Sequence, residues 1–168
     1  METRTHSDFE LRHATASDIS FIMATERGEG YGELVGRWDA DQHAAALADA
    51  RYAYFIGRSG DQPVGFAILR DWASSNQVTL VFRVAVAHAG AGYGKAMMRR
   101  VVDAAFRETD VYRLSIGVLP DNVRARRAYE AVGFRAEGIA RGAWLMNGIR
   151  CDELVLAVVR PDWEAEHA

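Results

Sequence analysis

A glycine-rich segment between a predicted strand and a predicted helix constrains this chain more than any other feature. Residues 78–87 are apolar enough to form a central strand, and Gly90, Gly92 and Gly94 follow directly. The next helix is predicted from an apolar stripe at helical spacing: Met97, Met98, Val101, Val102, Ala105 and Phe106. Glycine adopts positive φ and lets a ligand approach the backbone, so this loop before a helix N-terminus predicts an anion site.

Three phosphate-bearing ligands compete for such a loop. A mononucleotide loop needs GxxxxGK[ST], but Ala89 replaces the first glycine and Ala96 follows Lys95 where a hydroxyl should hold Mg²⁺. A dinucleotide loop needs GxGxxG in the first strand–helix unit, whereas these glycines alternate and follow four predicted strands. The pyrophosphate of coenzyme A is the third candidate.

The remaining elements predict one α/β (α+β) domain over residues 1–168, with a core of about 9–163. Periodicity and turn signals give the order β-α-α-β-β-β-α-β-α-β-β. Hairpins and strand–helix–strand crossovers alternate, so we expect a mixed central sheet flanked by about four helices. The hydrophobic content of 49% is sufficient for a single core.

Charge and cysteine content exclude several classes of protein. Twenty Lys+Arg against 23 Asp+Glu give a net charge of −3, so no basic field predicts a nucleic-acid partner. The single cysteine, Cys151, permits neither an internal disulfide nor a zinc ribbon. The longest apolar run, residues 154–159, is too short to span a membrane, and the first residues lack a signal-peptide pattern. We therefore expect a cytoplasmic protein with no membrane partner.

A second motif follows the glycine loop in order and spacing. It reads Asn122-x-x-Ala125-x-x-x-Tyr129-x-x-x-Gly133-Phe134. Together the two motifs resemble the GNAT superfamily of acyl-CoA N-acyltransferases, whose pyrophosphate loop reads [QR]xxGxG[GA]. Ala89 stands at the [QR] position, which removes one side-chain contact but leaves the backbone N–H groups. Element order supports the resemblance over residues 9–163, and the end of the chain is similar to the branch of ribosomal-protein and polyamine N-acetyltransferases.

The resemblance implies acetyl-CoA as co-substrate, with no metal. The strand before the loop would present backbone N–H groups to the thioester, and Tyr129 would protonate or hydrogen-bond to the departing thiolate. The implied cofactor-binding residues are Val84, Ala85, Val86, Ala89, Gly90, Ala91, Gly92, Tyr93, Gly94, Lys95, Ala96, Asn122, Ala125, Arg127 and Tyr129. Arg124 and Arg126 on the same helix are alternatives for the 3′-phosphate, although such a cluster is also typical of a solvated face.

The general base is left open by the sequence. Related proteins often carry a glutamate on the central strand, but residues 79–83 contain no acid. We name Glu29 and Glu33 in the early loop as first candidates. The alternatives are Glu26, Asp39, His43 and an ordered water chain.

The sequence thus predicts an acetyl-CoA-dependent N-acetyltransferase that works by direct attack in a ternary complex. The acceptor would be a primary amine, either a protein or peptide N-terminus or a small amine such as a polyamine or an aminoglycoside. An alternative is a catalytically silent acyl-CoA-binding or interaction module with the same fold. A third interpretation adds a regulatory homodimer that associates through the last hairpin.

Overall fold

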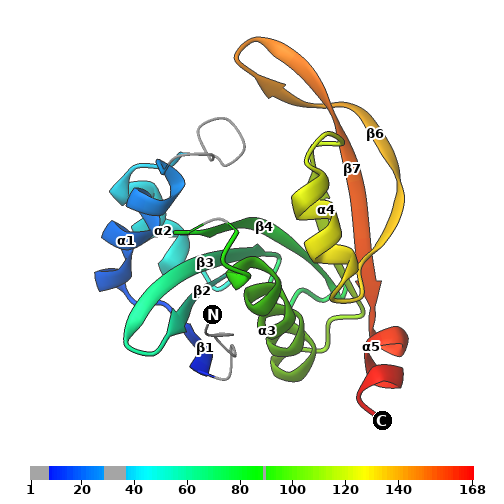
Figure 1. Ribbon diagram of the computed structural model, residues 1–168, viewed down its shortest axis with the longest axis horizontal. Helices are drawn as coiled ribbons and strands as arrows, with labels where there is room; N and C mark the ends of the chain where they lie inside the picture. Colours follow the sequence, from blue (N-terminus) through cyan, green and yellow to red (C-terminus); the bar gives the residue numbers. More distant parts are fainter. Residues whose placement is uncertain (1–7, 29–36, 89) are drawn as a thin grey trace, which may run out of the picture.

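A seven-stranded mixed sheet forms the centre of the molecule (Figure 1). The computed structural model describes residues 8–28, 37–88 and 90–168. The spatial order is β1-β2-β3-β4-β5-β7-β6, and among these neighbours the pair β4–β5 is parallel while the others are antiparallel. The strands are β1 (Phe9–His13), β2 (Tyr52–Ser59), β3 (Gln62–Arg70), β4 (Val78–Val86), β5 (Arg113–Val118), β6 (Arg135–Met146) and β7 (Ile149–Val159). The predicted mixed sheet is confirmed.

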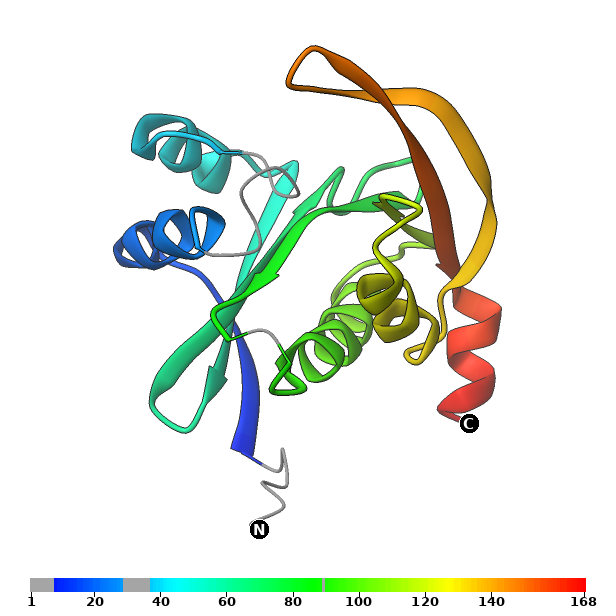
Figure 2. The ribbon, with the colours of Figure 1, turned by 45° about the horizontal axis from the view of Figure 1, so that its top comes forward.

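Helices cover the two faces of this sheet (Figure 2). They are α1 (Ile19–Glu26), α2 (Ala40–Ala48), α3 (Tyr93–Glu108), α4 (Val123–Glu130) and α5 (Arg160–Glu166), with a short 3₁₀ turn η2 (Ala16–Asp18) before α1. One face packs against α1 and α2, around Ile22 and Ile68. The other packs against α3, whose predicted apolar stripe is buried as expected, and against α4.

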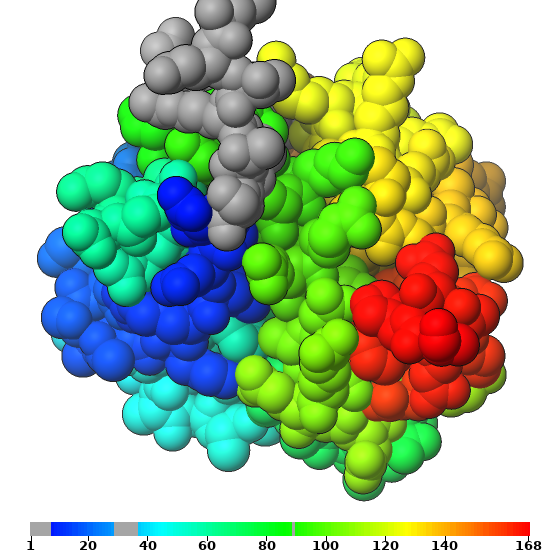
Figure 3. All heavy atoms as spheres, turned by 60° about the horizontal axis from the view of Figure 1, so that its bottom comes forward, coloured from blue at the N-terminus to red at the C-terminus, as the bar shows by residue number. Residues whose placement is uncertain are grey.

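The C-terminal helix α5 was not predicted. It packs beside α3 on the face shown in Figure 3, where the Trp163 ring stacks on Phe106 at 5.3 Å and its indole donates to Asp103 at 2.9 Å. Pro161 lies in the first turn of α5, a position that suits proline because the first helical N–H groups need no intrahelical acceptor. This proline was the signal available in the sequence.

Two local structures follow directly from residue types at short spacing. Asp39 and Gln42 form the reciprocal capping box that starts α2, with N–H to carboxylate and N–H to amide distances of 2.8 and 2.9 Å. Asn147 and Gly148 both have positive φ, 50° and 77°, as the tight turn between β6 and β7 requires. Among the described residues, no helix is long and apolar enough to cross a membrane.

Candidate active site

The parallel strands β4 and β5 diverge halfway along their length. Their ladder runs from Val78↔Arg113 to Val81↔Ile116 and stops there. Beyond Ile116, β5 continues to pair with β7, and beyond Val81, β4 continues to pair with β3. The two strand edges therefore face each other across an opening, where backbone groups can bind an extended ligand in place of a neighbouring strand.

A β-bulge lies where the strands separate. The register between β3 and β4 moves from Ile68↔Arg83 to Leu69↔Val81, so Phe82 is the additional residue. A bulge bends its strand and redirects side chains. Here it accompanies the turn of β4 away from β5, and no sequence signal predicted it.

The glycine loop lies beside this opening, at the start of α3. Gly90 and Gly92 have φ of 84° and 83°, in the region that favours glycine, and Gly92 is the N-cap of α3. Gly94 lies in the first helical turn, and a Cβ built there would meet no atom within 4 Å. The residues present thus fit an anionic ligand on the helix N-terminus. Ala89 falls outside the described residues.

Arg124 is the cation that α4 brings to the loop. Its Nη2 lies 4.0 Å from the position that a Cβ would take at Gly90. Arg126 instead pairs with Glu130 at 2.9 Å, and Arg127 lies exposed in the last turn of α4. Lys95 is exposed in the first turn of α3. The distinction among the arginines depends on how α4 is rotated against α3, which the sequence alone did not show.

The helix α4 also carries Asn122 and Tyr129. The Asn122 side chain caps α4, accepting from the Ala125 N–H at 3.2 Å. Tyr129 is half-buried against the core under α3, with its ring centroid 6.1 Å from that of Phe134. Asn122 therefore fixes the start of α4, and the tyrosine lies on the same side of the sheet as the glycine loop.

A buried ionic cluster lies on the opposite face, under α1 and α2. Glu26 and His43 are fully buried. Arg83 Nη1 donates to Glu26 at 3.1 Å, and the guanidinium stacks on Trp38 with its Cζ 4.4 Å from the ring centroid. His43 Nε2 lies 3.1 Å from the Glu26 carboxylate, and its Nδ1 lies 2.8 Å from the hydroxyl oxygen of Tyr54.

Glu26 and His43, two of the alternative candidates for the general base, belong to this cluster. Burial lowers the pKa of the Arg83 guanidinium, against the opposing effect of Glu26, and burial raises the pKa of Tyr54. Because Glu26 is bound by both Arg83 and His43, it holds α1 and α2 to β4. Asp39 caps α2. Glu29 and Glu33 lie outside the described residues.

A carboxylate that sequence reasoning missed lies on β7. The Glu153 side chain rests on Gly117 of β5, so that a Cβ at position 117 would coincide with Glu153 Oε1. Burial raises the pKa of Glu153, while a hydrogen bond with the Trp144 side chain acts in the opposite direction. Two features of the sequence could have indicated this contact: Gly117 lies inside a strand, and Glu153 lies next to an apolar run.

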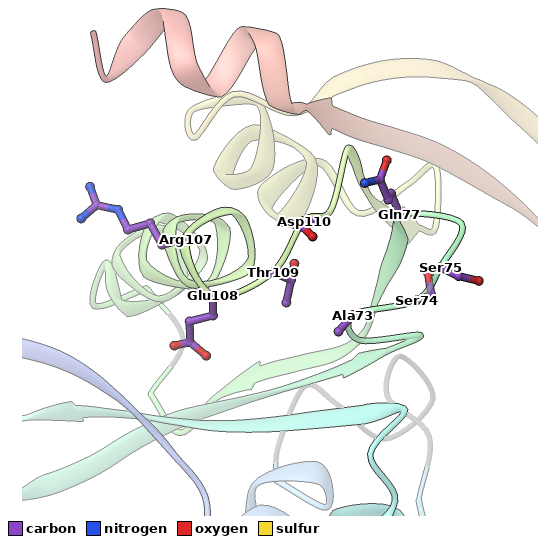
Figure 4. A pocket seen from close by; sticks show the side chains of 8 residues that line it. All are labelled: Ala73, Ser74, Ser75, Gln77, Arg107, Glu108, Thr109 and Asp110. Carbon is purple, nitrogen blue, oxygen red and sulfur yellow. The ribbon is translucent and has the colours of Figure 1, made fainter.

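A pocket of about 470 Å³ lies at the other end of α3 (Figure 4). Residues 107–110 line one side of this pocket, and residues of the connection between β3 and β4 line the other. The Arg107 side chain points away from that connection (Figure 4). Because the C-terminal end of a helix carries partial negative charge, this pocket does not suit a phosphate ligand. It is separate from the opening between β4 and β5.

The model of the acetyltransferase (GNAT) family matches residues 21–134, more than half of the chain. The chain belongs to the acetyltransferase (GNAT) family. The matched segment contains both the glycine loop and the Asn122–Tyr129 helix, so the resemblance inferred from these two motifs is confirmed.

Two curated relatives from Bacillus subtilis match about half of the chain. A probable N-acetyltransferase, YjcK, is 44% identical over 78 residues, and a putative ribosomal N-acetyltransferase, YdaF, is 31% identical over 77 residues. Each match covers 46% of this GNAT chain, and 43% and 42% of the two relatives. The matched part is thus less than half of either relative.

Solved structures from Vibrio cholerae share the fold over nearly the whole chain. A spermidine N-acetyltransferase in complex with CoA and spermine has a TM-score of 0.84 at 18% identity, covering 94% of this chain and 99% of that one. Mutant forms of the spermidine/spermine N-acetyltransferase SpeG have a TM-score of 0.84 at 19% identity, covering 96% of this chain and 99% of that one.

Proposed function

We propose that this protein transfers the acetyl group of acetyl-CoA to a primary amine by direct attack within a ternary complex. The observation that carries the proposal is the divergence of β4 and β5 beside a glycine loop at a helix N-terminus. The strand edge would bind the pantetheine amides, and the loop would bind the pyrophosphate. Membership of the GNAT family supports this arrangement.

The backbone would supply most of the cofactor contacts. N–H groups of Val84 and Val86 would stabilise the negative charge that develops on the thioester oxygen. The Ala85 N–H points toward β3, because N–H directions alternate along a strand and the Ala87 N–H donates to Val64 of β3. The loop and α3 N-terminus, residues 89–96, would hold the pyrophosphate, with Asn122, Ala125 and Arg127 of the α4 segment beside it. Arg124, which the fold places over Gly90, joins this set.

Tyr129 would donate a proton or a hydrogen bond to the leaving thiolate. Its position on α4, on the loop side of the sheet, supports this role. Phenol and thiol pKa values near ~10 and ~8.5 make full transfer uphill by about 2 kcal/mol, so hydrogen-bond donation suffices as the minimum role.

The acceptor would be a primary amine on a peptide N-terminus or a small molecule. The name of one curated relative favours a ribosomal-protein acceptor, and the complex of the Vibrio cholerae enzyme with spermine favours a polyamine. Both kinds of acceptor carry an ammonium group. The slightly acidic charge balance, −3, suits a cationic acceptor.

The proposal is tested by thiol release from acetyl-CoA with a panel of polyamines, aminoglycosides and N-terminal peptides. We expect CoA release with at least one amine, and mass spectrometry of that acceptor should show a gain of one acetyl group. Tight acetyl-CoA binding by calorimetry without release across the panel would instead identify a silent acyl-CoA-binding module.

Arg124→Ala is expected to weaken acetyl-CoA binding about tenfold, which corresponds to about 1.4 kcal/mol. The side chain lies over the loop, where it would pair with a phosphate. Calorimetric titration at two salt concentrations provides the measurement, since an ionic contact weakens with salt. Arg126→Ala is the matched control, because Arg126 pairs with Glu130. Equal losses in both variants would contradict a specific role for Arg124.

A further inference from the structure

We infer that Glu153 is the catalytic proton acceptor for the attacking amine. This inference rests on the proposed acetyl transfer and assigns the general base that the central strand does not supply. Three features of the structure carry it: the position of Glu153 at the opening between β4 and β5, its fit to Gly117, and the pairing of Arg113 and Arg83 with other carboxylates.

Glu153 lies on the face of the sheet that an acceptor would approach. Leu154 and Leu156 of β7 point into the core beneath α3, so the alternation along a strand directs Glu153 to the opposite face. The glycine loop and α4 occupy the α3 side. If acetyl-CoA enters from that side, the amine must reach the thioester from the face that carries Glu153.

The carboxylate sits where the two strands separate. Ile116 makes the last pair with β4, and the next β5 residue is Gly117, on which the carboxylate rests. Any side chain at position 117 would displace Glu153, since its Cβ would coincide with Oε1. Glycine weakens a strand interior, so the close approach of Glu153 provides a physical reason for glycine at this position.

Two cations on neighbouring strands are bound to other carboxylates. Arg113 of β5 binds Glu137 of β6 through two contacts of 2.7 Å, and Arg83 of β4 binds Glu26. The Trp144 side chain is the hydrogen-bonding partner identified for Glu153. Among the described residues Glu153 forms no ion pair, and burial raises the pKa of its carboxyl. Such a carboxylate is a better proton acceptor than an exposed or salt-bridged one.

Acetyl transfer to an ammonium group removes two protons from the nitrogen. The ammonium gives one proton to the Glu153 carboxylate, and the freed nitrogen lone pair forms the C–N bond to the acetyl carbon. The C–S bond then breaks with its electron pair on sulfur, which takes the proton of Tyr129. The second proton lost by the nitrogen restores Tyr129 through solvent, and Glu153 releases its proton to solvent.

Glu153→Gln tests the assignment because glutamine keeps the shape and an acceptor for Trp144. We expect kcat to fall about 100-fold or more, while the Kd for acetyl-CoA stays within about twofold. The acidic limb of the kcat/KM profile, where wild type loses activity as Glu153 protonates, should disappear. Glu137→Gln is the matched control: its carboxyl also belongs to this sheet, but Arg113 lowers its pKa, and its kcat should stay near wild type.

Two further measurements separate catalysis from folding. Gly117→Ala should lose kcat as Glu153→Gln does, because the added Cβ displaces the carboxylate. The Tm of Glu153→Gln at a pH of about 8 should equal or exceed that of wild type, and the difference should vanish toward a pH of about 4. This direction of the Tm difference follows from the raised pKa of Glu153 in the folded state. At high pH the ionised carboxylate lowers the stability of the wild-type fold, and at low pH protonation removes that cost.

An undiminished kcat in Glu153→Gln would overturn the assignment, and so would a fall in its Tm together with kcat. In either case, turnover by the wild-type protein would leave the proposed function intact. The assignment of Glu153 would also be overturned if Glu29→Ala or Glu33→Ala lost the acidic limb of the kcat/KM profile while Glu153→Gln kept it. Absence of wild-type turnover with every amine would reject the proposed function itself.

Discussion

Tyr129→Phe is expected to lower kcat by about two orders of magnitude while leaving the KM for acetyl-CoA within about twofold. The phenol would stabilise charge on the leaving sulfur, which develops only as the C–S bond breaks, so its loss raises the barrier without weakening ground-state binding. Steady-state thiol release with the best amine of the panel, together with calorimetric binding of acetyl-CoA, measures both quantities.

The control for this variant is Tyr112→Phe. Tyr112 precedes β5, is 50% exposed and lies away from the glycine loop, so its hydroxyl should not affect kcat. Tyr129 is half-buried against the core, and removing only its hydroxyl keeps the ring packing. An unchanged kcat in Tyr129→Phe would assign the residue to packing alone.

Glu26→Ala is expected to destabilise the fold by about 3–5 kcal/mol. The substitution would leave Arg83, whose side chain is 8% exposed, without its carboxylate partner in a buried site. His43 would lose its contact at the same time. Urea unfolding followed by circular dichroism measures the change as a lower midpoint with an unchanged m-value.

Two companion variants sharpen this test. Glu130→Ala removes an exposed pair with Arg126 on α4 and should cost less than about 0.5 kcal/mol. The double variant Glu26→Leu with Arg83→Met removes both buried charges and should recover a large part of the loss. A cost below about 1 kcal/mol for Glu26→Ala would show that this ion pair is not a main tie between α1 and β4.

The strands and the main helices were predictable because their signals are local. The stripe on α3, the capping box of α2 and the Asn147–Gly148 turn each depend on residues a few positions apart. Periodicity and turn chemistry are properties of such short segments. The helix α5 carried a weaker signal, one proline after a long strand, and was missed.

Local conformations within the candidate site were predictable for the same reason. Gly90, Gly92 and Asn122 have the conformations expected from their motifs. Arg124 required the packing of α4 beside α3, since three arginines on one short helix are equivalent in sequence. The bulge at Phe82 required the register between β3 and β4.

The sequence alone determined the strand–glycine loop–helix unit, the helix that bears Asn122 and Tyr129, and hence the GNAT family. Those features are encoded by residue type at fixed short spacing. Only the tertiary structure decided which acids have partners and which face the opening. Glu26 meets Arg83 across 57 positions, and Glu153 meets Gly117 because β7 pairs with β5. Burial and strand pairing set the environment of a carboxylate, and neither is visible in the residues that flank it.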